Sequence, residues 1–215
     1  GITYKNKEVH ILGYYVDSYN ANLRKISELA INDRANRLDI FEKNFAKFGI
    51  KIDKEKVLNY SKDKVFSRSN LAQYLVDINI CKNKNEAFNE YLSPKGKCYV
   101  AKNFTSLQNI IDSIKSANGV CVLAHPITLN DDNIVNEIID MGIDGIEVIN
   151  SKHSFTDIKK YLNIAIKNRL LYTAGSDCHG KQFDGNYLMG NFALNYSTLK
   201  SIKKLHELRS NYVIK

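Results

Sequence analysis

The sequence lacks long apolar runs, a leader-like segment and repeats, and these absences exclude several classes of protein. Its longest apolar runs, such as 119–124, fall far short of the ~20 residues that a membrane-spanning helix needs. No secretory leader opens the chain, and no low-complexity segment interrupts it. Because 44% of the residues are hydrophobic and 25% are charged, the composition is typical of a globular protein, and we expect no contact with a membrane.

Cysteine is scarce, and its spacing is that of no common disulfide or zinc motif. The four cysteines, which show no CxxC pair, are Cys81, Cys98, Cys121 and Cys178. This pattern predicts reduced thiols in a cytoplasmic protein, with neither a disulfide framework nor a zinc knuckle. The sequence also has no glycine-rich phosphate loop, no GxSxG elbow and no recognisable Cys–His nucleophile pair. It gives no indication of a protein partner.

Arginine is rare in a chain that is otherwise basic. The 31 basic and 23 acidic residues give a net charge of +8, but only six of the basic residues are arginine. No run of five or six like charges occurs, so the positive charge is spread along the chain. This distribution is typical of a solvated surface, and it is compatible with an anionic substrate.

The periodicity of apolar residues divides the chain into an all-helical part and an α/β part. Residues 2–4 and 8–16 predict a β-hairpin. Helical spacing then predicts four helices, over 20–48, 54–61, 70–79 and 86–92. Farther on, helices alternate with short apolar strands, which predicts a parallel sheet covered on both faces. We therefore expect an inserted helical cap over 20–95, and an α/β domain built from 1–19 and 96–215.

Polar side chains that can bind metal or transfer protons lie at the ends of the predicted strands. They are His125 after strand 120–124, Glu147 within and His153 after strand 145–149, and Asp177 and His179 after strand 170–174. His10 lies on the second strand of the hairpin. Side chains from the carboxyl ends of parallel strands converge at one edge of a sheet. Imidazole and carboxylate groups without thiolates are typical of a hydrolytic Mn²⁺, Fe²⁺ or Zn²⁺ site.

Each of these residues also has a structural interpretation that the sequence leaves open. The alternatives are a loop histidine for His125, a core or surface position for His10, an Asx turn for Asp177, a helix lead-in for His153 and an ion pair within the sheet for Glu147. His206 has helical spacing and is expected on the surface. Metal-assisted hydrolysis is the chemistry that the residues favour.

Four segments, in this order, resemble the motifs of PHP-domain (polymerase and histidinol phosphatase) metallophosphoesterases. They are HILGY at 10–14, VLAHP at 122–126, GIEV at 145–148 with His153-Ser154, and GSDCHG at 175–180. The resemblance is strongest to the branch with a helical insertion, which hydrolyses nucleoside 3′,5′-bisphosphates and trims short RNA from its 5′ end. It spans nearly all of the chain, including the insertion, and the segments 67–72 and 91–92 to 99–100 also fit.

The resemblance implies a fold, a cofactor and a set of site residues. The fold would be α/β: a distorted (β/α)7-type barrel, here lacking its first strands, with an all-helical insertion. Two or three divalent metal ions, Mn or alternatively Fe or Zn, would be held by His10, His125, Asp177 and His179, with no catalytic residue beyond these ligands. Arg68 would clamp a substrate phosphate, its alternative being a surface residue at a helix start. His153 would lie near the phosphate or in the outer shell of the metals.

Some motifs of the family are missing from this sequence. An HxHxxxSDG motif, a TDHD-like strand end and a metal-binding Glu would all precede Gly1, and Asn70 stands where the family often has His. We therefore expect a fragment with an incomplete site. Its parent would be a metal-dependent phosphoesterase that acts on nucleotides or short RNA. The alternatives are a histidinol-phosphatase-like enzyme and an inactive fragment that binds nucleotide or RNA.

Overall fold

The computed structural model describes residues 1–180, 182–183 and 186–213, and the chain divides into two compact units. One unit, called here the sheet unit, comprises Gly1, Glu8–Arg24 and Ser106–Lys215; the other, the helical unit, comprises Ile2–Lys7 and Lys25–Thr105. The domain boundaries expected at 20 and 95 stay a prediction. Among the described residues, no helix combines the length and the apolar character that a membrane span requires.

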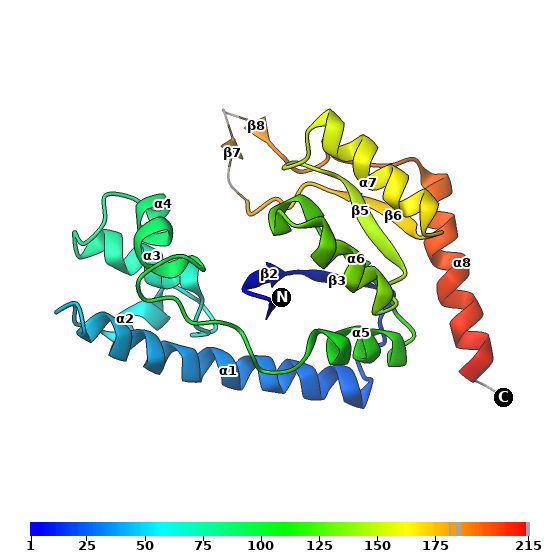
Figure 1. Ribbon diagram of the computed structural model, residues 1–215. Helices are drawn as coiled ribbons and strands as arrows, with labels where there is room; N and C mark the ends of the chain where they lie inside the picture. Colours follow the sequence, from blue (N-terminus) through cyan, green and yellow to red (C-terminus); the bar gives the residue numbers. More distant parts are fainter. Residues whose placement is uncertain (181, 184–185, 214–215) are drawn as a thin grey trace. The chain divides into compact units, whose positions relative to one another are not determined.

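Short strands form the sheets of the structure (Figure 1). In chain order the strands are β1 (Ile2–Tyr4), β2 (Lys7–Val9), β3 (Ile11–Tyr14), β4 (Val120–Leu123), β5 (Gly145–Asn150), β6 (Leu171–Gly175), β7 (Gln182–Phe183) and β8 (Asn186–Tyr187). Strands β1 and β2 pair as a hairpin, and β7 and β8 pair as another. The strand predicted over 8–16 is wrong as a continuous element, because it divides into β2 and β3 with His10 between them.

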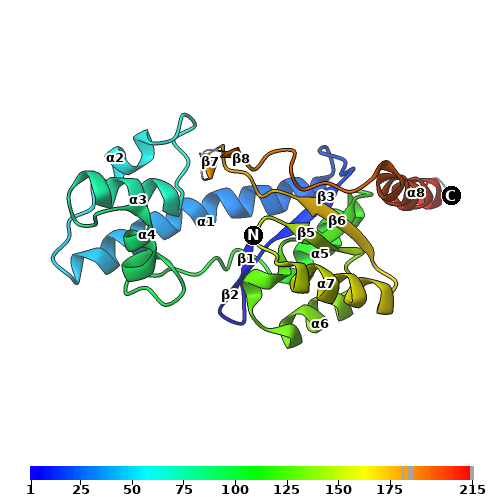
Figure 2. The ribbon, with the colours of Figure 1, turned by 90° about the horizontal axis from the view of Figure 1, so that it is seen from above.

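The main sheet has the strand order β3-β4-β5-β6, and Figure 2 shows β3, β5 and β6 of this sheet. Strands β4, β5 and β6 run parallel, as their uninterrupted apolar sequences predict, and all four residues of β4 are buried. Strand β3 runs antiparallel to β4, with Ile11 opposite Leu123. Within the described residues this sheet is not closed into a barrel. The architecture is therefore mixed α/β, with an open sheet.

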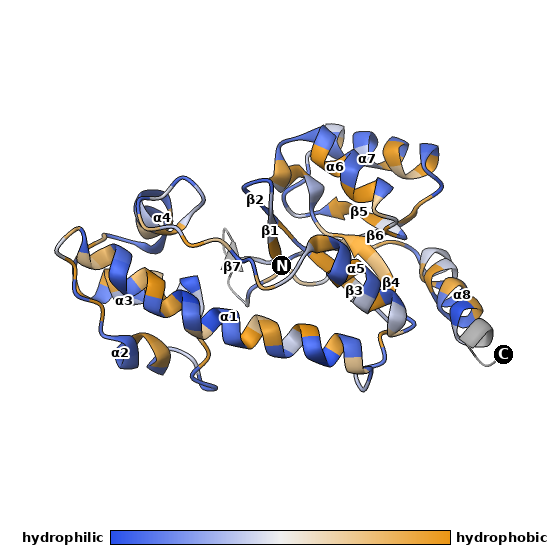
Figure 3. Cartoon of the chain, turned by 60° about the horizontal axis from the view of Figure 1, so that its bottom comes forward, coloured by the Kyte–Doolittle hydropathy of each residue, from blue (hydrophilic) through white to orange (hydrophobic). Residues whose placement is uncertain are grey.

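Helices cover both faces of this sheet. They are α5 (Leu107–Ser116), α6 (Asp132–Asp140), α7 (Phe155–Lys167) and α8 (Tyr196–Val213), with a short 3₁₀ helix, η2 (Pro126–Leu129). Ile202 of α8 packs in one cluster with Val120 and Val122. A side chain at Gly13 would instead meet Ile114 of α5, so α5 lies on the opposite face. Figure 3 shows hydrophilic and hydrophobic residues side by side along these helices, as expected for helices with one buried face.

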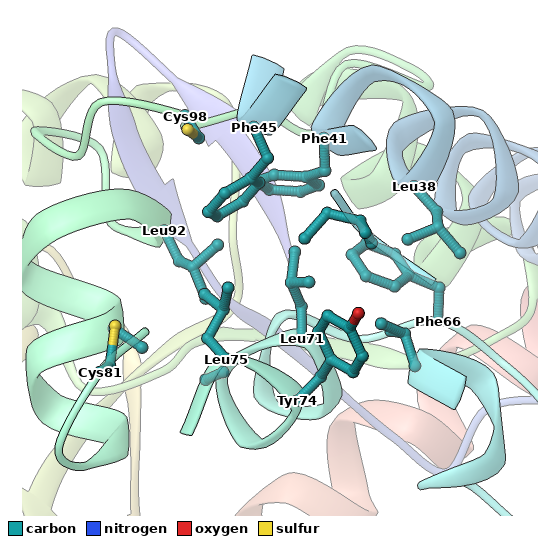
Figure 4. Packing of buried hydrophobic residues seen from close by; sticks show 14 residues of the cluster. Leu38, Phe41, Phe45, Phe66, Leu71, Tyr74, Leu75, Cys81, Leu92 and Cys98 are labelled. Atoms are coloured by element: carbon teal, nitrogen blue, oxygen red, sulfur yellow. The ribbon is translucent and has the colours of Figure 1, made fainter. Parts of the chain in front are cut away.

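The helical unit has a hydrophobic core of its own. Its helices are the greater part of α1 (Ala21–Ala46), with α2 (Lys54–Asn59), α3 (Arg68–Asp77), α4 (Lys84–Ala87) and a π-helical turn, η1 (Phe88–Leu92). Phe41 and Phe45 of α1 point toward Leu71 and Leu75 of α3, and all four side chains are fully buried (Figure 4). Burying a side chain of this size contributes roughly 1.5–3 kcal/mol, so this cluster stabilises the unit.

Candidate functional site

The candidate site lies at the carboxyl edge of strands β4, β5 and β6. His125 directly follows β4, Glu147 belongs to β5, and Asp177 follows β6 by two residues. Because the three strands are parallel and adjacent, their carboxyl ends bring these side chains to one edge of the sheet. Lys152, two residues after β5, donates from its ammonium to Asp177 Oδ2 at 2.6 Å, so the segments that follow β5 and β6 meet at this edge.

His10 and His125 form the geometric centre of this edge. Nδ1 of His10 lies 3.0 Å from Nε2 of His125, and the two rings meet edge to face with centroids 5.0 Å apart. His10 reaches this position because it lies between β2 and β3, and the latter pairs with β4. The backbone of His125 has a φ of 27°, outside the ordinary range for a non-glycine residue. Such strained residues concentrate at functional sites.

Glu147 is a buried carboxylate that bonds the backbone of His125. It is 4% exposed, and its Oε2 accepts hydrogen bonds from the His125 backbone N–H at 2.8 Å and from Asn150 Nδ2 at 3.0 Å. Asn150 Nδ2 also donates to the Gly175 carbonyl, which ties β5 to β6. A Cβ at Gly175 would come within 2.6 Å of Glu147 Oε1, so only glycine leaves room for this carboxylate. Burial raises the pKa of Glu147, although both hydrogen bonds oppose the rise.

Asp177 has a cationic neighbour, Lys152. The Lys152 ammonium donates to Asp177 Oδ2 at 2.6 Å, while the Lys152 backbone N–H donates to Asn150 Oδ1 at 3.0 Å. Partial burial alone would raise the pKa of Asp177, but the hydrogen bond and charge of Lys152 outweigh it, and the pKa is lowered. Asp177 also has a positive φ of 49°. His179 is exposed, and its Nδ1 lies 2.7 Å from the Asp177 carbonyl oxygen.

The donors at this edge fit a divalent cation in chemistry, while their number falls short of a complete site. Burial lowers the pKa of His125 to about 4, with help from the charges of Lys152 and His10, so this ring is neutral near pH 7, as a metal ligand must be. His10 and His125 bring two imidazole nitrogens within 3.0 Å of each other, and imidazole is a common ligand of divalent transition metals. No group of three or more His, Cys, Asp or Glu side chains suited to a metal ion occurs among the described residues.

His153 is also buried, but it lies between β5 and α7. Its Nδ1 lies 2.7 Å from the Val148 carbonyl oxygen, and its ring lies against Tyr161 with centroids 5.1 Å apart. The ring is 9% exposed, and its Nε2 is buried without a hydrogen-bond partner. A contact of His153 with a substrate phosphate stays a prediction.

Arg68 belongs to the helical unit, where it is the first residue of α3. Its Nη1 donates to the Leu92 carbonyl at 3.1 Å, and the guanidinium lies 5.8 Å from the ring centroid of Phe88 and 5.9 Å from that of Tyr99. Ser67 caps the helix by accepting from the Asn70 N–H. The guanidinium is thus anchored on one backbone oxygen and two aromatic faces, and its role as a phosphate clamp stays a prediction.

Two residues of this edge carried little signal in the sequence. Asn150 is fully buried and connects Glu147, Gly175 and Lys152, yet it occurs in no recognised motif. Its position as the last residue of an apolar strand was the only indication. Lys152 resembles any other lysine of this lysine-rich chain, so its pairing with Asp177 becomes visible only in three dimensions.

Comparison with known proteins gives a consistent set of similarities. The chain is 33% identical over 120 residues to a 3′,5′-nucleoside bisphosphate phosphatase of Chromobacterium violaceum, covering 54% of this chain and 42% of that protein. It is 24% identical over 181 residues to the 5′-3′ exoribonuclease Rnm of Salmonella typhimurium, covering 82% of this chain and 62% of that protein. No family model matches the chain.

A solved structure extends the similarity to the fold. A protein of Bifidobacterium adolescentis described as a metal-dependent phosphoesterase superposes with a TM-score of 0.79 at 25% identity, covering 95% of this chain and 73% of that one. The chain spans less than two thirds of the length of either curated relative. The similarity therefore covers nearly all of this chain in the solved structure, but only part of each curated relative.

Proposed function

Since this chain is related, at modest identity, to the PHP-family metal-dependent phosphoesterases, we propose that it contributes to the hydrolysis of phosphate esters of nucleotides. The substrates proposed are nucleoside 3′,5′-bisphosphates or the 5′ ends of short RNA. The observation that carries the proposal is the pair of imidazole nitrogens 3.0 Å apart at the carboxyl edge of a parallel sheet, where Glu147 bonds the backbone of His125 and Asp177 follows the next strand. We also propose that the open sheet is part of a distorted (β/α)7-type barrel, with 20–95 inserted as a helical cap.

The residues proposed to hold divalent cations, Mn²⁺ or alternatively Fe²⁺ or Zn²⁺, are His10, His125, Asp177 and His179. A bound cation of this kind supplies Lewis acidity toward a phosphate oxygen and lowers the pKa of a bound water. His125 contributes a neutral imidazole, because its burial disfavours the charged ring.

The neighbouring residues of this chain hold that edge in place. Glu147 fixes the backbone of His125 through one hydrogen bond, and Asn150 fixes Glu147. Lys152 places an ammonium beside Asp177, where it can neutralise part of the charge of an incoming phosphate. These contacts are made before any substrate arrives, so the edge needs little rearrangement.

The substrate contacts proposed are Arg68 and His153. A guanidinium matches a phosphate through paired N–H donors, and Arg68 is one of only six arginines in the chain. The net charge of +8 favours an anionic substrate in general. The relatives named above act, by their descriptions, on a nucleoside bisphosphate and on RNA, which supports nucleotides as the substrate class proposed here.

The test is phosphate release from a nucleoside 3′,5′-bisphosphate in the presence of Mn²⁺. We expect His125→Ala and Asp177→Ala to lower the rate by at least about 100-fold, since even outer-shell changes cost about 10- to 100-fold. Asp140→Ala, which removes an exposed carboxylate at the end of α6, serves as the matched control and should leave the rate unchanged. Unchanged turnover in either site variant would refute the assignment.

Two further experiments on the same protein test the two alternatives to this function. A substrate panel that includes histidinol phosphate decides between a nucleotide phosphatase and a histidinol-phosphatase-like enzyme. Metal analysis decides whether the chain is instead an inactive nucleotide- or RNA-binding fragment. Such a fragment would hold metal weakly or at one site, whereas two or more ions per chain would contradict that alternative.

A further inference from the structure

The hydrogen bonds around His125 specify which of its ring nitrogens carries the proton. Thr128, in the 3₁₀ helix η2 directly after His125, places its Oγ1 3.0 Å from His125 Nδ1. The same hydroxyl donates to the His125 carbonyl oxygen at 3.0 Å. A hydroxyl has a single proton, and here that proton is already used. With that proton on the carbonyl, the Thr128 oxygen accepts toward Nδ1, and both contacts are satisfied together when Nδ1 is the protonated nitrogen.

The other ring nitrogen, Nε2, consequently carries a lone pair, and it faces the candidate site. A neutral imidazole protonated at Nδ1 has an unprotonated Nε2, which is the atom 3.0 Å from His10 Nδ1. On His10 the far nitrogen, Nε2, lies 3.5 Å from the Glu8 carboxylate. Both rings thus have oxygen partners at their far nitrogens and turn their near nitrogens toward each other.

In the metal-free protein His10 Nδ1–H can donate to this lone pair, and a divalent cation can take the place of that proton. We propose that Thr128 is a positioning residue, which holds His125 in the Nδ1–H tautomer so that Nε2 is presented to a divalent cation. This inference rests on the proposed function for its cation, while the tautomer itself can be measured without metal.

The first experiment determines the tautomer of His125 in the metal-free protein by two-bond ¹H–¹⁵N correlation spectra of the imidazoles. The wild type should show a protonated Nδ1 and an unprotonated Nε2. Thr128→Val, which has a similar shape but no hydroxyl, should shift the proton to Nε2, where His10 Nδ1 can accept it. Thr128→Ser should restore the wild-type spectrum. Thr156→Val, which changes an exposed threonine of α7, is the matched control and should leave it unchanged.

The second experiment measures Mn²⁺ affinity in the same variants by calorimetric titration. Thr128→Val should raise the Kd by about 10- to 100-fold, the usual cost of losing an outer-shell partner, and Thr128→Ser should bind like the wild type. A wild-type His125 protonated at Nε2, or a Thr128→Val variant with unchanged tautomer or unchanged Kd, would overturn the inference. If the wild type bound no Mn²⁺, the proposed function would fail, and the metal-free spectra would still decide the role of Thr128 in the tautomer.

Discussion

At the scale of single residues, burial decides how the histidines of the sheet unit ionise. His125 and His153 are both buried, and burial lowers the pKa of each. For His153 the lowering occurs although its hydrogen bond to the Val148 carbonyl favours the charged ring. A buried neutral imidazole is suited to bind a cation or to pack against an aromatic ring. His125 lies against His10 at the sheet edge, and His153 lies against Tyr161.

The buried state of His153 predicts a pH dependence of stability. In the unfolded chain a histidine titrates near its ordinary pKa of about 6.5, whereas in the folded protein the pKa of His153 is lower. Between the two values the unfolded chain binds more protons, so the free energy of unfolding should fall as the pH drops below about 6.5. Urea unfolding at about pH 7.5 and at about pH 5 measures this fall. We expect the free energy of unfolding to fall less between these pH values in His153→Asn, which keeps a donor near Val148, than in the wild type. Equal losses in both proteins would contradict this.

At the scale of elements, side-chain caps fix where the helices around the site begin. Ser154 and Asp157 form a reciprocal capping box at the start of α7: Ser154 Oγ accepts from the Asp157 N–H, and Asp157 accepts from the Ser154 N–H at 2.9 Å. These bonds occupy backbone donors that the first turn leaves without helical partners. Because His153 directly precedes the cap, this start also sets the direction in which the chain leaves β5.

Removal of this cap should weaken the sheet unit measurably. We expect Ser154→Ala to lower the free energy of unfolding by about 1 kcal/mol, because it removes the acceptor for the Asp157 N–H. Ser154→Thr keeps a hydroxyl at the same position and should recover most of the loss. Chemical denaturation monitored by circular dichroism measures both variants. A Thr variant as unstable as the Ala variant would show that the hydroxyl is not responsible.

At the scale of the whole molecule, two properties bear on the binding of an anion: the net charge and the division of the chain into two units. The net charge of +8 acts on any anion approaching the protein, and salt screens it over about 8–10 Å at physiological ionic strength. The helical unit contributes no residue to the His10–His125 pair, but it contains Arg68. The protein thus has the His10–His125 pair within one unit and a positive net charge that attracts anions in general.

The charge predicts how activity should respond to salt. For a nucleoside bisphosphate, kcat/KM should fall as the salt concentration rises, mainly through KM, because screening weakens long-range attraction. A monophosphate ester with fewer charges provides the control, and its kcat/KM should fall less steeply. Steady-state kinetics between about 50 mM and about 200 mM salt measure both slopes. Equal slopes for the two substrates would contradict the prediction.

Local patterns in the sequence were sufficient to predict most elements of secondary structure. The apolar strands at 120–124, 145–149 and 170–174 predicted a parallel pairing, which is confirmed in β4, β5 and β6. The pattern failed at His10, because alternation alone cannot show that a strand changes partners from β1 to β4. Ser67 and Asn83 each accept a hydrogen bond from the first turn of a helix, as serine and asparagine favour at such positions. These predictions depend on neighbours within a few residues along the chain.

The sequence by itself determined which residues can bind cations and at which strand ends they lie, since both are local properties of residue type and order. Only the tertiary structure decided that His10 meets His125, that Gly175 leaves room for Glu147 and that Lys152 pairs with Asp177. These contacts join residues 25 to 115 positions apart. Chain folding, rather than any spacing in the sequence, sets such distances, because strand order and register bring distant side chains to one edge.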